Sequence, residues 1–104
     1  MEVGRSYRVN RGELVAKLAR RAGVTPTMAR AIIDLLFGAG DDDGLLAEGM
    51  QHDGRVVVSG FGTFYLRRRP ARVMTNPRTG RRRSLGPEDV PAFRPAPRLR
   101  HRLR

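Results

Sequence analysis

The chain has 104 residues, no cysteine and a formal net charge of +11, so we expect one small domain without disulfides or thiolate metal sites. No apolar run approaches the ~18–20 residues that cross a bilayer, and no signal-peptide core is apparent, so we expect a cytoplasmic protein. The charge is uneven: residues 1–54 carry seven basic and eight acidic side chains, whereas residues 55–104 carry fourteen arginines against only Glu88 and Asp89. Such a one-sided field indicates a polyanionic partner, either nucleic acid or an anionic membrane surface.

The first half predicts amphipathic helices. Asn10 is a candidate N-cap, with Glu13 three residues later to complete a capping box, and Gly23 is a candidate C-terminal stop. Thr25 and Pro26 have the residue types of an N-cap and a first helical position. The apolar stripes expected to face the core are Leu14, Val15, Leu18 and Ala19 in the first helix and Met28, Ile32, Leu35 and Leu36 in the second.

The segment GAGDDDG, residues 38–44, predicts a break after the second helix. We expect Asp42 or Asp43 to cap a further helical segment over residues 44–52, in which Leu46 and Met50 continue the buried face.

The same acidic segment does not fit a calcium loop. Such a loop needs acids at alternate positions and a glutamate at the twelfth, and counting from Asp41 places Leu45 fifth and His52 twelfth. Neither His52 nor His101 has neighbours that suggest metal binding or acid–base catalysis. We therefore expect no catalytic residue, no metal, no cofactor and no small-molecule substrate.

After residue 54 the pattern changes to β-branched and aromatic residues, which predicts strands over about 55–59 and 61–70 with Gly60 in the turn between them. MTNPRTG (74–80) reads as the next turn and RRRSLG (81–86) as the returning strand. VPAFRP (90–95) is expected at a sheet edge because of its prolines. PRLRHRLR (97–104) predicts a short last helix. The order of these elements indicates an α+β fold.

Residues 65–85 predict a projecting β-ribbon. Arg67 and Arg69, and beyond the tip Arg81 and Arg83, fall on alternating positions, so each pair shares a face of the ribbon. Few apolar residues remain to pack the ribbon on a core. Because an isolated hairpin is marginally stable in water, we expect the ribbon to be mobile until it meets its partner.

A nucleic-acid groove is the partner that best fits such a ribbon. A two-stranded ribbon fits into a groove, and a narrow minor groove attracts arginine through its enhanced negative potential. Pro77, at the expected tip, is an apolar wedge of the kind that slips between base steps and kinks the duplex. The sequence thus predicts double-stranded DNA as the partner.

SGFGTF (59–64), NPRTG (76–80) and VPAFRP (90–95), following a helical first half, resemble the bacterial HU and integration host factor family. The resemblance covers residues 9–104 and implies an intertwined homodimer, or a heterodimer with a related subunit. It implies a helical dimerisation base (9–54), a small sheet with a long β-arm (55–95) and a C-terminal helix (96–104), preceded by a flexible tail (1–8).

The resemblance also implies roles for individual residues. Pro77 matches the intercalating residue, and Asn76 is its neighbour at the tip. The residues implied to contact DNA are Arg67, Arg69, Arg72, Asn76, Pro77, Arg78, Arg81, Arg82, Arg83 and Arg94. Those implied to pack the dimer core are Phe37, Phe61, Phe64 and Phe93.

The chain departs from the family pattern in three places. Thr75 stands where the family usually has a basic residue, and Arg81 to Arg83 supply compensating charge. The segment 38–43 looks like an acidic insertion in a helix that the family leaves unbroken. Pro97 shortens the last helix and is expected to weaken its packing.

The function predicted from these features is that of a nucleoid-associated architectural protein, which binds DNA with little sequence specificity through β-arms in the minor groove and bends it. A site-specific protein resembling integration host factor is the nearer alternative. A basic RNA-binding or ribosome-associated protein is a more distant one, because the arm has no aromatic residues to stack on single-stranded bases.

Overall fold

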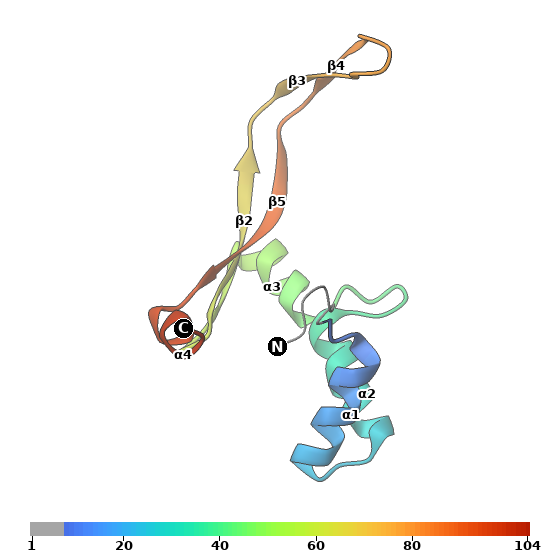
Figure 1. Cartoon of the computed structure of the whole chain (residues 1–104), viewed down its shortest axis with the longest axis vertical. Coiled ribbons are helices and arrows are strands. Elements are labelled where there is room, and N and C mark those ends of the chain that lie inside the picture. The colour runs from blue at the N-terminus through green and yellow to red at the C-terminus, as the bar shows by residue number, and fades with distance from the viewer. Residues whose placement is uncertain (1–7) are drawn as a thin grey trace, which may run out of the picture. The chain divides into compact units, whose positions relative to one another are not determined.

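The computed structural model describes residues 8–104, so the predicted tail lies, except for Arg8, outside the described residues. The helices and strands run in the order α1 (Arg11–Ala22), α2 (Pro26–Phe37), α3 (Leu45–Asp53), β1 (Arg55–Val58), β2 (Gly62–Arg69), β3 (Arg72–Thr75), β4 (Arg82–Leu85), β5 (Glu88–Pro95) and α4 (Pro97–Arg102) (Figure 1). The chain divides into two compact units between Ala47 and Glu48. The predicted α+β order is confirmed.

The boundaries of α1 and α2 follow from their capping residues. Asn10 Oδ1 accepts a hydrogen bond from the Glu13 backbone N–H at 2.9 Å, and Thr25 Oγ1 accepts one from the Met28 N–H at 3.1 Å. Gly23 ends α1 with φ 69°, in the left-handed region that favours glycine. The helix starts and the stop predicted from the sequence are therefore confirmed.

The core of the first unit is a narrow seam between α1 and α2. Its buried side chains are Val15, Ala19, Ala29 and Ile33, with Leu18 and Val24 packed against them. The alanines bring the two helices close together, so few other side chains fit into the seam.

The predicted inner face of α2 is wrong for a single chain. Met28 is 54% exposed and Leu35 is 55% exposed, whereas Ile32 is half-buried. Helical periodicity locates an apolar stripe but does not say which part of it meets α1, and here Ala29 and Ile33 do so. The remainder of the stripe, continued by Leu36 and Phe37, is exposed within residues 8–104.

The predicted break is confirmed, and the acidic segment forms a small closed loop. Helix α2 ends at Phe37, and Ala39 and Asp42 exchange two backbone hydrogen bonds of 3.0 Å. Asp42 Oδ1 accepts a further hydrogen bond from Gly44 N–H at 3.0 Å, just before α3 begins. Along α3 the predicted face of Leu46 and Met50 is only half-buried.

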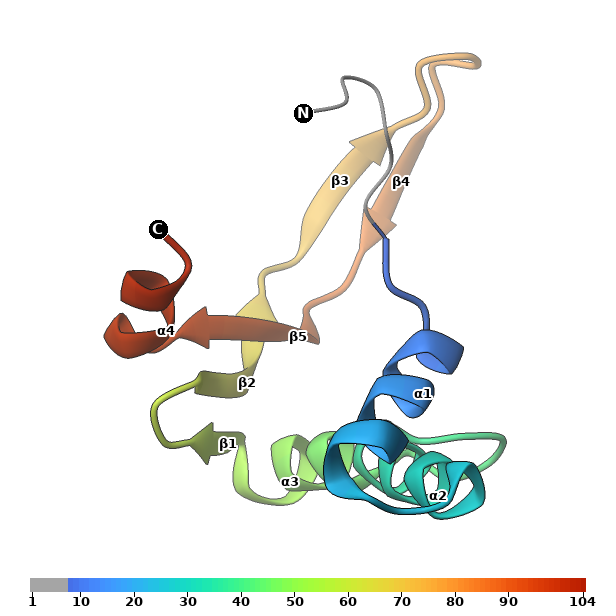
Figure 2. The same cartoon turned by 60° about the horizontal axis from the view of Figure 1, so that its bottom comes forward.

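The second unit is built on an antiparallel sheet in the order β1-β2-β5, from which the β3-β4 ribbon continues (Figure 2). Val56 pairs with Phe64, which pairs with Phe93 on β5, so the aromatic side chains gather on one face. The turn between β1 and β2 is closed by a hydrogen bond from Phe61 N–H to the Val58 carbonyl, with Gly60 at φ 79°. Strand β5 lies at the edge, as its prolines predict.

Candidate nucleic-acid interface

The arm consists of the outer ends of β2 and β5 and the ribbon β3-β4. Arg69, at the end of β2, pairs with Glu88, and Arg72, at the start of β3, pairs with Leu85. The register of pairing is therefore the same on both sides of the break between the two ladders, which we call the junction. Between these pairs lie Pro70–Ala71 on one strand and Gly86–Pro87 on the other. A proline has no N–H to donate to the ladder, which interrupts the pairing at the same level in both strands, and the ribbon changes direction there (Figure 2).

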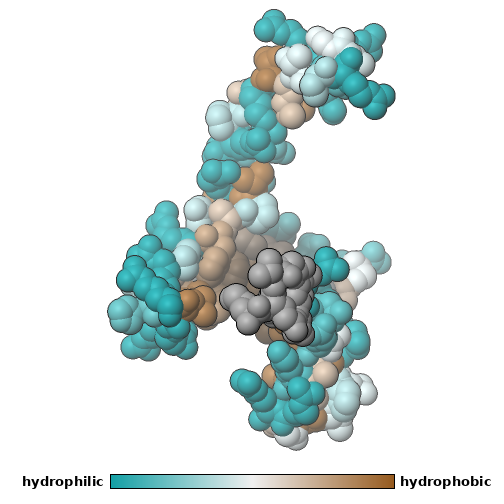
Figure 3. All heavy atoms as spheres, in the orientation of Figure 1, coloured by the Kyte–Doolittle hydropathy of each residue, from teal (hydrophilic) through white to brown (hydrophobic). Residues whose placement is uncertain are grey.

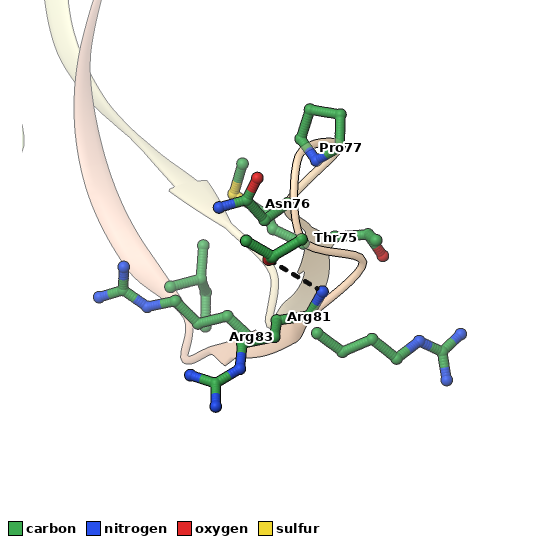
Figure 4. A pocket seen from close by; sticks show the side chains of 9 residues that line it. Thr75, Asn76, Pro77, Arg81 and Arg83 are labelled. Carbon is green, nitrogen blue, oxygen red and sulfur yellow. Dashed lines mark hydrogen bonds between the residues drawn. The ribbon is translucent and has the colours of Figure 1, made fainter.

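The tip loop is held by its own polar groups. Asn76 N–H donates to the Arg81 carbonyl at 2.8 Å, and the Asn76 carbonyl accepts from Gly80 N–H at 2.8 Å. Asn76 Oδ1 accepts from Arg78 N–H at 2.8 Å, and Thr79 Oγ1 accepts from Arg81 N–H at 3.2 Å. These hydrogen bonds fix the loop conformation and place Pro77 at its outer end, pointing away from the Arg83 side chain (Figure 4).

The cross-strand register assigns the arginines of the ribbon to its two faces. Met74 is paired with Arg83, and Thr75 with Arg82. Residues that are directly opposite share a face and successive residues alternate, so Arg83 and Arg82 face opposite sides. The side chains that line a hollow at the tip are Met74, Thr75, Asn76, Pro77, Thr79, Arg81, Arg82, Arg83 and Leu85.

Most of the predicted contact arginines are exposed, and hydrophilic residues cover much of the arm (Figure 3). Arg67 and Arg69 lie on β2, on the part of the arm nearer to the sheet. Arg94 lies on the sheet itself, with its guanidinium carbon 5.4 Å from the centre of the Tyr65 ring. The predicted contacts are thus spread from the sheet to the tip, and the tip hollow gathers only part of them.

Arg72 differs from the other predicted contacts. Its Nη2 lies 3.2 Å from Glu88 Oε1, and its side chain is only 24% exposed. Arg68, the residue that follows Arg67 in β2, makes a second ion pair of 3.4 Å with Asp89. The only acids of the second half are therefore both paired at the base of the ribbon.

Met74 and Leu85 are residues of this site that the sequence reasoning missed. Met74 is 52% exposed and lies opposite Arg83 in the wall of the tip hollow. The sequence alone does not give the cross-strand register that places Met74 opposite Arg83.

The predicted dimer-core aromatics do not all come together within one chain. The rings of Phe61, Phe64 and Phe93 lie with centroids 4.8 to 6.4 Å apart. Phe61 and Phe93 remain 41% and 40% exposed. Phe37 belongs to the first unit, at the end of α2, and is 49% exposed.

Within residues 8–104, no group of three or more acidic or histidine side chains is placed to hold a metal ion. In the same part of the chain, no helix has the length and apolar character needed to cross a membrane.

The sequence matches the family model described as bacterial DNA-binding protein over residues 9–104. It is 33% identical over 92 residues to the SPbeta prophage-derived DNA-binding protein HU 2 of Bacillus subtilis, covering 88% of this chain and 94% of that protein. It is 30% identical over 95 residues to integration host factor subunit alpha of Stenotrophomonas maltophilia, covering 91% and 90%. The fold is similar to that in a cocrystal structure of Anabaena HU with DNA, with a TM-score of 0.77 at 30% identity and coverage of 91% of this chain and 97% of that chain. The chain therefore belongs to the bacterial DNA-binding protein family, which includes HU and integration host factor.

Proposed function

We propose that this protein is a nucleoid-associated architectural protein that binds double-stranded DNA through its arm and bends it with Pro77. One observation carries the proposal: an exposed proline stands at the outer end of a ribbon whose strands and loop carry arginines. Membership of the family supports it, as does the similarity to the HU–DNA cocrystal structure.

Phosphate neutralisation supplies most of the affinity. The exposed arginines of the arm lie along a narrow ribbon, and the negative potential of a narrow minor groove attracts arginine side chains, which release condensed counterions from the phosphates. Binding therefore weakens steeply with salt. Because these contacts carry no sequence information, sequence preference is slight and follows the ease with which the DNA deforms.

Pro77 acts as the wedge. Its ring is exposed at the end of a loop whose conformation is held by hydrogen bonds that the Asn76 and Thr79 side chains accept from backbone N–H groups, so the ring is presented in a fixed direction. Insertion between base steps unstacks them at a few kcal/mol per step, which the additional wrapped contacts offset.

The working form is a dimer, either of identical chains or with a related subunit. In one chain the exposed apolar side chains include Met28, Leu35, Leu36 and Phe37 on α2, Val57 and Phe93 on the sheet, and Phe61 in the turn between β1 and β2. Apolar surface of this extent marks an interaction site. We assign residues 9–54 to the dimerisation base, 55–95 to the sheet and arm, and 96–104 to the C-terminal helix.

The same proposal places the protein with DNA in the nucleoid, and assigns it no catalytic role and neither a membrane nor a small molecule as a partner. Its relatives named above are DNA-binding proteins of the HU and integration host factor type rather than enzymes. The exposed residues of the arm include most of its arginines and Pro77, which suit phosphate and groove contacts.

A site-specific role is the second candidate, favoured by the similarity to integration host factor subunit alpha. Competition by random-sequence DNA separates the two. A site-specific protein retains a subset of genomic fragments under excess random competitor, whereas a non-specific one is displaced from all of them.

The arm is tested by reversing the charge of Arg67 and Arg69 together (Arg67→Glu, Arg69→Glu) and measuring duplex affinity against salt. We expect a large loss of affinity and a shallower salt slope, because phosphate contacts are lost. The matched control is Arg20→Glu with Arg21→Glu in the last turn of α1, which changes net charge equally. Equal effects of both double variants would mean that net charge, and not the arm, drives binding, and a preference for single-stranded RNA would favour the RNA-binding alternative.

A further inference from the structure

The junction at Pro70–Ala71 and Gly86–Pro87 leaves the ribbon β3-β4 without backbone hydrogen bonds that cross the junction to β2 and β5 in the described ladders. The direction of the ribbon relative to the sheet is therefore not held by ladder hydrogen bonds, and it depends on the backbone of these four residues and on side-chain contacts across the junction. The nearest charged pairs are Arg68–Asp89 and Arg72–Glu88, and they differ in one respect.

Arg68 and Asp89 are register partners within the β2-β5 ladder, so their ion pair lies wholly on the sheet side of the junction. Arg72 belongs to β3 and Glu88 to β5, so the second ion pair joins the ribbon to the sheet across the junction. It is the one ion pair of the described residues that does so.

The Arg72 guanidinium depends on Glu88 for its position. Its Nη2 donates to Glu88 Oε1 at 3.2 Å, whereas its Nε and Nη1 are buried and have no hydrogen-bond partner within residues 8–104. A guanidinium packed in this way has one anionic contact to hold it. Without that contact, a largely buried charge is left unpaired and swings out to water.

We propose that the Arg72–Glu88 pair is a latch that sets the direction of the arm before DNA is bound. Arg72 is then a positioning residue of the arm and not a DNA contact. The latch narrows the motion expected of a free hairpin, so less freedom is lost when the ribbon enters a groove. Its consequence for binding rests on the proposed function, but its consequence for the free protein does not.

The test uses Glu88→Gln and, as matched control, Asp89→Asn. The control removes an equal charge at the next residue, but it breaks the Arg68–Asp89 pair, which does not cross the junction. Residual dipolar couplings of the backbone amides are measured in the free protein. We expect Glu88→Gln to reduce the couplings of β3 and β4 alone, while Asp89→Asn leaves them in agreement with those of β2 and β5. The charge-swapped variant Arg72→Glu with Glu88→Arg is expected to restore them.

In duplex binding, the affinity of Glu88→Gln should be about two- to five-fold lower than that of Asp89→Asn, in the range of ion pairs at a protein surface, because Glu88 is 51% exposed although Arg72 is only 24% exposed. Equal couplings in the two variants would overturn the latch, as would couplings that the charge swap does not restore. A protein that bound no DNA in any variant would refute the proposed function, and the couplings would still decide whether the latch exists.

Discussion

At the tip of the arm, some side chains hold the loop in its conformation, whereas others present charge or apolar surface to the outside. Asn76 and Thr79 use their side-chain oxygens within the loop, so their first role is to fix its conformation. Arg83 and Met74 are both exposed and lie directly opposite each other; under the proposed function, Arg83 offers its charge to a phosphate and Met74 offers an apolar surface to the sugars of the groove.

Met74→Ala is expected to weaken duplex binding about two- to five-fold, through the apolar area no longer covered, with an unchanged dependence on salt. Arg83→Ala, its register partner, should instead lower the salt slope by about 0.9 for the lost phosphate contact. Fluorescence anisotropy at a series of salt concentrations measures both. A reduced slope for Met74→Ala would contradict a contact made without charge.

Gly62 is a residue whose missing side chain matters for stability. A Cβ placed there would lie 2.5 Å from Phe93 Cε1 and 2.6 Å from the Arg94 carbonyl oxygen. Gly62→Ala should therefore lower the free energy of unfolding by about 1–3 kcal/mol. Gly86→Ala is the control, because a Cβ there meets open space, and its effect should stay within about 0.5 kcal/mol. Urea unfolding at one fixed protein concentration compares them, and equal losses would refute the close packing.

At the scale of elements, the sequence predicted what local chemistry decides. The caps at Asn10 and Thr25, the break after Phe37 and the hairpin turns depend on residues close in the chain, and all are present. The prediction of the buried face of α2 was wrong, because whether Met28 or Ala29 faces the core depends on how α1 packs against α2.

The site was predictable to a similar extent. The positions of Pro77 and of the flanking arginines follow from turn signals and alternation. The ion pair of Arg72 with Glu88 could not be predicted, because it joins strands whose register and change of direction cannot be deduced from the sequence.

The acidic loop between α2 and α3 is an element with its own steric requirement. Gly44 has φ 87°, and a Cβ there would collide with backbone atoms of Phe37 and Gly38, whereas Gly40 has φ 60° and open space around it. Both substitutions by alanine strain the backbone, but only Gly44→Ala should also open the loop and fray the start of α3. Amide hydrogen exchange of residues 38–48 detects this, and equal exchange in the two variants would contradict it.

At the scale of the whole molecule, the exposed apolar residues predict that the chain does not function alone. Leu35→Asp on α2 should convert a dimer into monomers, because it places a charge on the exposed apolar face that we propose as the subunit interface. Leu103→Asp is the control, since Leu103 is even more exposed, at 75% compared with 55%. Sedimentation velocity reports the mass, and a dimer that survives Leu35→Asp would place the interface elsewhere.

The uneven charge also belongs to this scale. The second half carries the excess of arginine and the first half is close to neutral, so the attraction for a polyanion comes from the second half of the chain.

The central claim, that the arm bends DNA with Pro77, is tested most directly by energy transfer between dyes on the two ends of a short duplex. Wild-type protein and Pro77→Ala are titrated into intact and centrally nicked duplexes at two salt concentrations. We expect the wild type to give a large bend, salt-sensitive affinity and a preference for the nicked duplex, and Pro77→Ala to keep the electrostatic affinity while bending less. A bend angle that is unchanged in Pro77→Ala, or tight binding by the wild type without any bend, would contradict the claim.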